Sequence, residues 1–179
     1  MKALLIVDLQ NDFCPGGALA VKEGDKVIPV INKIMDKFTI IVASKDWHPD
    51  DSIHFVKWPK HCIRNTRGAE FHPDLNTKPI NKVFLKGTEG KDDGYSAFQA
   101  TNENLEKYLK DRNVDELYVT GLATDYCVLQ SALDAVKKGF KTYVLTDGVM
   151  AVNVNEGDGA RALQEMKEVG VALTNTQSI

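Results

Sequence analysis

The chain has 179 residues, of which 43% are hydrophobic and 26% are charged, and its formal net charge is -3. This length and composition are typical of a globular protein with one core, so we expect residues 1–179 to form one domain. The slightly acidic balance argues against a nucleic-acid-binding surface. A membrane-spanning helix is also excluded, because no apolar run approaches the ~20 residues that it needs.

The N-terminal apolar run is short. It covers residues 3–7 and ends at Asp8, whereas the apolar part of a signal peptide needs ~7–15 residues and is followed by a small-residue cleavage site. We therefore interpret it as a first β-strand and expect a cytoplasmic protein. The three cysteines, Cys14, Cys62 and Cys127, are an odd number and so give no complete disulfide framework.

Short apolar runs alternate with stretches of helical periodicity along the rest of the chain. The runs are rich in β-branched and aromatic residues, which favours strands buried on both faces. Including the first, they cover residues 3–7, 40–43, 83–85, 117–119, 142–145 and 171–173. Helical stretches lie at residues 25–38, 104–112, 125–138 and 159–169. This alternation predicts an α/β fold, a doubly wound parallel six-stranded sheet with right-handed crossovers.

Two segments depart from this alternation. Residues 45–82 show no clear period and are rich in His, Pro, Asp, Asn and Trp. A long irregular segment in a compact domain is usually functional or disordered, and the tryptophans and histidines argue against disorder. Residues 86–97 form a second loop, rich in Gly and Asp. We expect both segments to contribute to a functional site.

Reactive side chains follow the predicted strands. Asp8 ends the first strand, Asp46 follows the second, and Lys86 follows the third. The fourth strand runs into G-L-A-T-D-Y-C, which opens a helix that contains Cys127. Ligands of open parallel sheets bind beyond the carboxyl ends of the strands, where the strand order reverses. If the order is 3-2-1-4-5-6, Asp8 and Cys127 face each other at that point.

A cysteine by itself is more typical of a protein core than of a nucleophile. Cys127, however, lies in the first turn of a predicted helix, where unpaired N–H groups and the helix dipole favour a thiolate. Asp8 as proton acceptor and Lys86 as a stabilising cation would complete a nucleophilic site. The N–H groups of Ala123 and Cys127 could form an oxyanion hole, the alternative being an ordinary capped strand–helix connection.

The segment D-W-H-P-D-D-S-I-H-F, with W-P-K-H-C further on, is the candidate metal site. Asp46 and His48 alternate, so both can point at one centre if the chain is extended there. His54 and His61 are within reach along the loop, and His72 in G-A-E-F-H-P competes for a ligand position. One carboxylate with imidazoles suits zinc, iron or manganese. The spacing alone leaves metal binding open, because there is no C-x-x-C or H-E-x-x-H.

Three aromatic residues, Phe13, Trp58 and Tyr95, fall on loops that follow or lie between the strand ends. Taken singly, each is more typical of a loop anchor. Together they could form the walls of a site for a flat, ring-shaped ligand.

These motifs together resemble those of the nicotinamidases, in the isochorismatase-like hydrolase superfamily. V-D-L-Q-N-D-F and G-L-A-T-D-Y-C-V-L-Q-S-A-L-D-A mark the superfamily, and D-W-H-P with W-P-K-H-C is specific to its metal-containing nicotinamidase branch. The resemblance, which covers nearly the whole chain, implies the strand order 3-2-1-4-5-6 with helices on both faces. It also implies hydrolysis of nicotinamide to nicotinate and ammonia through a cysteine thioester, a step of NAD salvage, with pyrazinamidase activity as well.

The resemblance further implies roles for individual residues. The catalytic triad would be Asp8, Lys86 and Cys127. The oxyanion hole would be formed by the N–H groups of Ala123 and Cys127, in a turn with a cis peptide at Leu122–Ala123. The residues implied or expected to bind the substrate are Phe13, Trp58, Tyr95 and Leu122.

The implied metal is a divalent ion that orients the pyridine ring, with zinc as our first choice and iron or manganese as the alternatives. Its ligands would be Asp46, His48 and His61, which makes the histidine of G-A-E-F-H-P structural. Some relatives have a fourth ligand where His54 stands, so it is included. Ser52 replaces a histidine of other relatives, so Ser52 or water are the alternatives for that position.

The alternative function is that of another amidohydrolase of this superfamily, acting on a small carbamoyl or ureido substrate. The same triad would serve it, but D-W-H-P with W-P-K-H-C would be unexplained. A non-catalytic metal-dependent binding domain has no need of the triad. We expect a small-molecule substrate and neither nucleic acid nor membrane as a partner. The sequence leaves the oligomeric state open, a homo-oligomer included.

Overall fold

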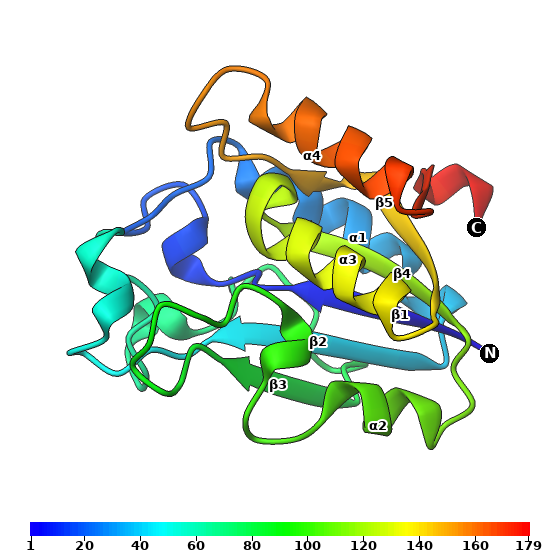
Figure 1. Ribbon diagram of the computed structural model, residues 1–179, viewed down its shortest axis with the longest axis horizontal. Helices are drawn as coiled ribbons and strands as arrows, with labels where there is room; N and C mark the ends of the chain where they lie inside the picture. The colour runs from blue at the N-terminus through cyan, green and yellow to red at the C-terminus, as the bar shows by residue number, and fades with distance from the viewer.

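A six-stranded sheet in the order β3-β2-β1-β4-β5-β6 forms the centre of the molecule (Figure 1). All five strand pairings are parallel, which confirms the predicted fold class and order. The structure is a computed structural model and describes residues 1–179. The strands are Lys2–Val7 (β1), Ile40–Asp46 (β2), Lys82–Lys86 (β3), Glu116–Leu122 (β4), Lys141–Met150 (β5) and Ala172–Thr174 (β6).

Both faces of the sheet are covered by helices. The helices are Val27–Ile34 (α1), Leu105–Lys110 (α2), Leu129–Lys137 (α3) and Asp158–Glu168 (α4). Buried side chains of α1 belong to one hydrophobic cluster, and those of α2, α3 and α4 belong to a second one. No helix is long and apolar enough to cross a membrane.

Strand β1 explains why the sheet is apolar on both sides. Its fully buried side chains alternate between the two clusters, as the period of a strand requires. Leu4 and Ile6 pack in the cluster that contains α1, whereas Ala3, Leu5 and Val7 pack in the cluster that contains the other helices. A strand buried on both faces reads as a continuous apolar run, which is the pattern seen in the sequence.

The predicted helix at residues 25–38 is α-helical only over Val27–Ile34. Short 3-10 turns flank it at Gly24–Lys26 and Met35–Lys37. The buried residues of α1 recur on one face of the helix, where they contact the sheet. Pro29 lies in the first turn, where a backbone N–H has no partner inside the helix, so the helix tolerates it.

The strand register brings the carboxyl ends of the strands to one edge of the sheet. Val7 pairs with Gly121, and Asp46 pairs with Lys86. Gly121 has φ +105°, and a Cβ there would lie 2.0 Å from the carbonyl oxygen of Val7. Only glycine fits this close approach, which places the end of β4 beside the end of β1. Asp8, the next residue of the chain, therefore starts directly beside the turn that follows β4.

Residues 47–81, here called the histidine segment, contain no α-helix and no strand of the sheet. The segment forms 3-10 turns at Ile53–Val56 and Arg67–Ala69 and isolated bridges. Polar side chains tie it to the sheet. The buried Gln10 side chain donates to the carbonyl oxygens of Asp46 (2.7 Å) and Ala69 (2.9 Å). The segment is thus ordered without regular secondary structure, as its histidines and tryptophans predict.

Candidate active site and metal centre

Lys86 is the centre of a buried polar cluster at the ends of the strands. Its Nζ lies 2.6 Å from Asp8 Oδ2 and 2.5 Å from Asp46 Oδ1. The same ammonium group donates to Gly94 O at 2.7 Å and to Cys127 Sγ at 3.3 Å. The side chains of Lys86 and Asp8 are fully buried. The structure therefore brings together the three residues that the sequence assigns to a triad, and adds Asp46 to them.

Burial and the charges of neighbouring groups compete in this cluster. Burial raises the pKa of Cys127 well above the usual value, although the Lys86 charge opposes the shift. It also raises the pKa of Asp8, again against Lys86. For Asp46, burial is outweighed by Lys86 and the nearby histidines, and the pKa is lowered. For Lys86, burial is outweighed by both carboxylates, and the pKa is raised. Lys86 is therefore a permanent cation beside the thiol.

The turn after β4 differs from the expected helix start. The peptide bond Leu122–Ala123 is cis, as the resemblance implies. The residues Thr124–Val128 then form a π-helical turn, and α3 begins only at Leu129. Cys127 lies within this turn. A helix start was expected to favour a thiolate. Desolvation of the buried sulfur has the larger effect and raises the pKa of the thiol.

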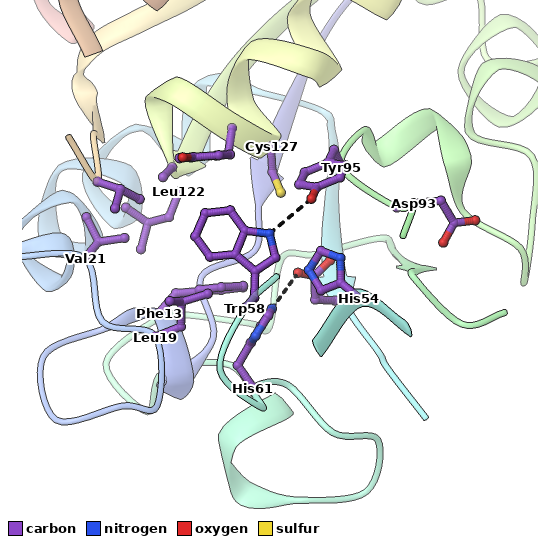
Figure 2. Close-up of a pocket in the computed structure, with 15 residues that line it drawn as sticks. Phe13, Leu19, Val21, His54, Trp58, His61, Asp93, Tyr95, Leu122 and Cys127 are labelled. Atoms are coloured by element: carbon purple, nitrogen blue, oxygen red, sulfur yellow. Dashed lines mark hydrogen bonds and ion pairs between the residues drawn. The ribbon is translucent and has the colours of Figure 1, made fainter. Parts of the chain in front are cut away.

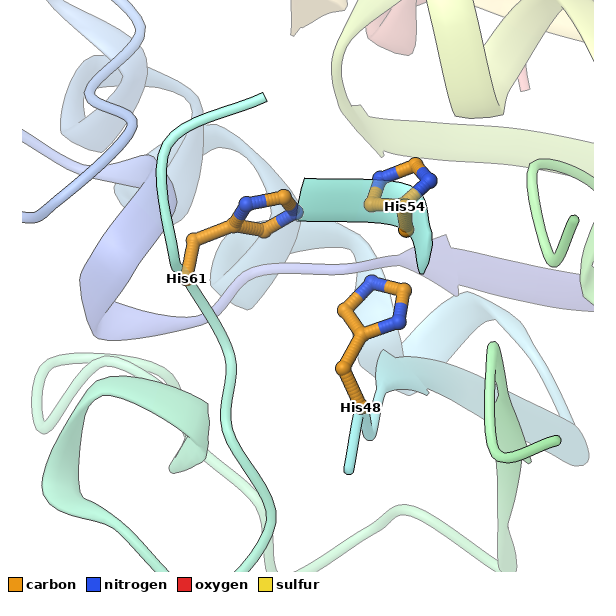
Figure 3. Close-up of side chains that lie close together, drawn as sticks. All are labelled: His48, His54 and His61. Carbon is orange, nitrogen blue, oxygen red and sulfur yellow. The ribbon is translucent and has the colours of Figure 1, made fainter. Parts of the chain in front are cut away.

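Three histidines of the histidine segment form a second cluster (Figure 3), and Asp46 links it to the first. A nitrogen of His48, His54 and His61 each lies within 4.8 Å of the others, and all three residues are buried. The rings of His48 and His54 are stacked, with centroids 4.5 Å apart. Asp46 Oδ2 lies 3.5 Å from His48 Nε2 and 3.8 Å from His61 Nε2. Asp46 thus contacts Lys86 through one oxygen and the histidines through the other.

The donor atoms of this cluster fit a divalent metal ion. Every Nδ1 faces an oxygen acceptor: Gly87 O for His48 (3.0 Å), Pro59 O for His61 (2.7 Å) and Asp92 Oδ1 for His54 (3.0 Å). Each Nδ1 therefore carries the proton, and each Nε2 keeps a lone pair for a metal. His48 Nε2 is buried and has no hydrogen-bond partner. A Cβ on Gly87 would lie 2.4 Å from the His48 ring, so glycine is required there.

His54 suits a ligand position for a further reason. Burial, followed by the neighbouring His48, lowers its pKa to about 4. The imidazole is therefore neutral near neutral pH, as a metal ligand must be. Ser52, the alternative to His54, has its hydroxyl engaged as the acceptor for the His54 backbone N–H at 3.3 Å.

His72 lies elsewhere. Its Nδ1 accepts from the backbone N–H of Asp74 at 3.2 Å. It lines a surface depression with residues such as Arg67 and Gly68, apart from the other histidines. His61 thus belongs to the histidine cluster and His72 does not. The structure distinguishes these two histidines, which the sequence pattern left as alternatives.

An apolar pocket connects the two clusters (Figure 2). The lining contains Cys127 and Ala123 together with Asp46, His54 and His61. All four residues expected at the substrate also line it, namely Phe13, Trp58, Tyr95 and Leu122. Trp58 and Tyr95 are joined by a hydrogen bond of 3.1 Å from the indole N–H to the phenol oxygen. A planar ring in this pocket would lie between the sulfur and the histidines.

Sequence reasoning missed several residues of the pocket. Leu19, Val21 and Val152 line it, but they belong to loops whose apolar residues carry no motif. Tyr126 could have been found, because it directly precedes Cys127; its ring packs edge-on against Trp58, with centroids 5.1 Å apart.

Known proteins share both the sequence and the fold. The nicotinamidase of Escherichia coli is 43% identical over 96% of this chain and 93% of its own length. The structure of an Acinetobacter baumanii nicotinamidase and pyrazinamidase superposes with a TM-score of 0.93 at 41% identity, covering 99% of this chain and 97% of that one. The pyrazinamidase of Pyrococcus horikoshii, solved in complex with zinc, has a TM-score of 0.88 at 44% identity, covering 97% and 98%. The isochorismatase domain matches residues 2–178, and the chain belongs to the isochorismatase family.

Proposed function

We propose that the protein is a nicotinamidase, which hydrolyses nicotinamide to nicotinate and ammonia through a cysteine thioester. The observation that carries the proposal is the double contact of Asp46. One of its oxygens touches the Lys86 ammonium of the Asp8–Cys127 cluster, and the other faces His48 and His61. A nucleophile and a ring-orienting group thereby share one pocket. The similarity to proteins named nicotinamidase, over nearly the whole chain, supports this substrate.

The first half-reaction forms the thioester. Asp8 takes the proton of the Cys127 thiol while the sulfur attacks the carboxamide carbon, since the raised pKa of the buried thiol makes the neutral form the resting one. The carbonyl oxygen becomes an oxyanion, which the N–H groups of Ala123 and Cys127 stabilise. The C–N bond then breaks, the nitrogen takes the proton from Asp8, and ammonia leaves.

The second half-reaction releases the acid. Asp8, again a carboxylate, takes a proton from water, and the hydroxide oxygen attacks the thioester carbon. The C–S bond breaks as the oxyanion collapses, and the sulfur regains a proton from Asp8. Nicotinic acid and the free thiol result, and the acid gives its proton to water to become nicotinate. Throughout both steps Lys86 stays protonated, and its 2.6 Å contact with Asp8 and 3.3 Å contact with the sulfur hold the two groups in place.

A divalent ion would be held by Asp46, His48, His54 and His61. Zinc is our first choice for this ion, and iron or manganese are the alternatives. When bound, the ion supplies a Lewis acid for the pyridine nitrogen, directly or through water, and so orients the ring. Phe13, Trp58 and Tyr95 would flank the ring. Pyrazinamide, which differs only by a second ring nitrogen, fits the same arrangement, so we expect it to be hydrolysed too.

We also assign the enzyme to the cytoplasm. All three cysteines are free thiols in the structure. In that compartment thiols stay reduced, which would keep Cys127 available as the nucleophile.

The direct test is product analysis. Purified protein should release ammonia and nicotinate in equal amounts from nicotinamide, lose this activity after prolonged chelation, and regain it with zinc, iron or manganese. A small carbamoyl or ureido compound serves as the competing substrate. Turnover of that compound, with nicotinamide left intact, would contradict the proposed function.

A further inference from the structure

Asp92 lies in the loop after β3, outside the residues assigned above to the triad, the metal or the pocket wall. Its Oδ1 is 3.0 Å from His54 Nδ1 and 3.0 Å from the hydroxyl of Tyr95. Its Oδ2 pairs with the ammonium group of Lys57. The Tyr95 hydroxyl in turn lies 3.1 Å from the indole nitrogen of Trp58. One carboxylate is therefore linked to a metal-site histidine and to two walls of the pocket.

The directions of these hydrogen bonds follow from the chemistry of the groups. The indole N–H of Trp58 can only donate, so the Tyr95 oxygen accepts from it. The phenol hydrogen is then left for Asp92, which as a carboxylate can only accept. His54 must also donate to Asp92, and its Nδ1 therefore carries the ring proton. The remaining lone pair of His54, on Nε2, is the one left to coordinate a metal.

We propose that Asp92 is a positioning residue that fixes His54 and the Tyr95–Trp58 wall as one hydrogen-bonded unit, and thereby couples metal binding to binding of the substrate ring. The substrate named in this inference rests on the proposed function. The tests of metal affinity and of Trp58 emission described below do not depend on turnover. The carboxylate fixes the tautomer of His54, as outer partners of metal-bound histidines do. It also holds the phenol that orients the indole.

Lys57 supports the unit from outside. Its ammonium group pairs with Oδ2 of Asp92, the oxygen that His54 and Tyr95 leave free. The Lys57 side chain is 65% exposed, whereas that of Asp92 is 25% exposed and that of His54 only 5%. The network thus runs from the protein surface to the candidate metal centre.

The first test measures metal affinity. Zinc binding, followed by competition with a chromogenic chelator, should be roughly 10–100-fold weaker in Asp92→Ala, the usual cost of losing such an outer partner. Asp92→Asn should fall between Ala and wild type, because its amide oxygen can still accept. Asp50→Asn is the matched control: this exposed acid on the histidine segment also pairs with a lysine, Lys60 at 2.7 Å. It should bind zinc as wild type does.

The second test follows the wall of the pocket. The chain has two tryptophans, so a Trp47→Phe background leaves Trp58 as the only indole. Adding Asp92→Ala should shift the Trp58 emission of the zinc-free protein, and Tyr95→Phe should do the same, whereas Asp50→Asn should not. With saturating zinc, Asp92→Ala should raise the KM for nicotinamide severalfold more than it lowers kcat.

The outcomes separate this inference from the proposed function. Zinc affinity within twofold of wild type in a folded Asp92→Ala protein would overturn the positioning role. Weaker zinc binding with unchanged Trp58 emission would overturn the coupling to the wall. If nicotinamide is not a substrate at all, the zinc and fluorescence measurements still decide whether Asp92 organises the site.

Discussion

The two halves of the site are held in place by different means. Asp8 and Lys86 are at or directly after the ends of β1 and β3, and Cys127 follows β4 by a short turn. Their spacing is therefore set by backbone pairing in the centre of the sheet. The histidines belong to residues 47–81, which contain no strand of the sheet and no α-helix. Their spacing depends on hydrogen bonds between loops, from the backbone, as His48 N–H to Cys62 O at 3.0 Å, and from side chains.

This difference predicts how the two halves respond to change. Sheet hydrogen bonds and two hydrophobic clusters support the triad, so the loss of one reacting group should remove chemistry and leave the fold intact. The histidine segment is not paired into the sheet, so the loss of one of its hydrogen bonds should alter metal binding while the nucleophile stays in place. Asp46 belongs to both halves, because it ends β2 and also faces the histidines.

The largest expected effect is that of Cys127→Ala. Turnover should fall by ~10⁴-fold or more, as it does when other nucleophiles are removed, because no other group can form the thioester. Metal content and the circular dichroism spectrum should match wild type. Cys14→Ala and Cys62→Ala are the controls: both should keep the chemistry, although each removes a buried side chain. Normal turnover in Cys127→Ala would show that the nucleophile lies elsewhere.

Next in size is Asp8→Asn. The amide cannot accept the thiol proton, so kcat should fall by roughly 10²–10⁴-fold, the usual contribution of a general base. The rate of iodoacetamide alkylation of Cys127 should also change its dependence on pH, because, besides burial, the Asp8 charge raises the pKa of that thiol. Measuring that rate against pH tests the pairing directly. An unchanged alkylation profile with full activity would remove Asp8 from the mechanism.

The pair His61→Ala and His72→Ala isolates the metal half. His61→Ala should weaken metal binding by more than the roughly 10–100-fold cost of an outer partner and raise KM, because it removes a direct ligand. His72→Ala should keep metal stoichiometry near wild type, since the His72 ring hydrogen-bonds to the backbone N–H of Asp74 and lies apart from the other histidines. Elemental analysis after dialysis decides between them. Metal loss in His72→Ala alone would reverse the ligand assignment.

The smallest effect is expected for Asp12→Ala, which removes a tie of the histidine segment. Asp12 Oδ2 accepts from the backbone N–H of Cys62, next to His61, at 2.7 Å. Its loss should cost about 1–3 kcal/mol of stability in urea unfolding, because a donor is left unsatisfied. Metal affinity should fall as well, whereas kcat at saturating metal should change little. A drop in kcat as large as that of Asp8→Asn would mean that the two halves are not separate.

Several features of this protein follow from the sequence. Continuous apolar runs predicted the six strands, and their alternation with helical periods predicted the parallel fold, because strands buried on both faces need helices on either side. The motifs that resemble the nicotinamidases predicted the strand order and the residues to place at its reversal. Asp8, Lys86 and Cys127 were recognisable because each follows an apolar run in the chain.

The tertiary structure decided the rest. Three features join residues that are far apart in the chain and lie in or beside loops without hydrophobic periodicity. They are the double contact of Asp46, the network around Asp92, and the pocket walls formed by Leu19 and Val21. The local sequence did not predict the pKa of Cys127 either. Its position near a helix start favours a thiolate, but burial raises the pKa. Periodicity reports which face of an element is buried, whereas contacts between loops and the desolvation of a charge depend on how the whole chain packs around them.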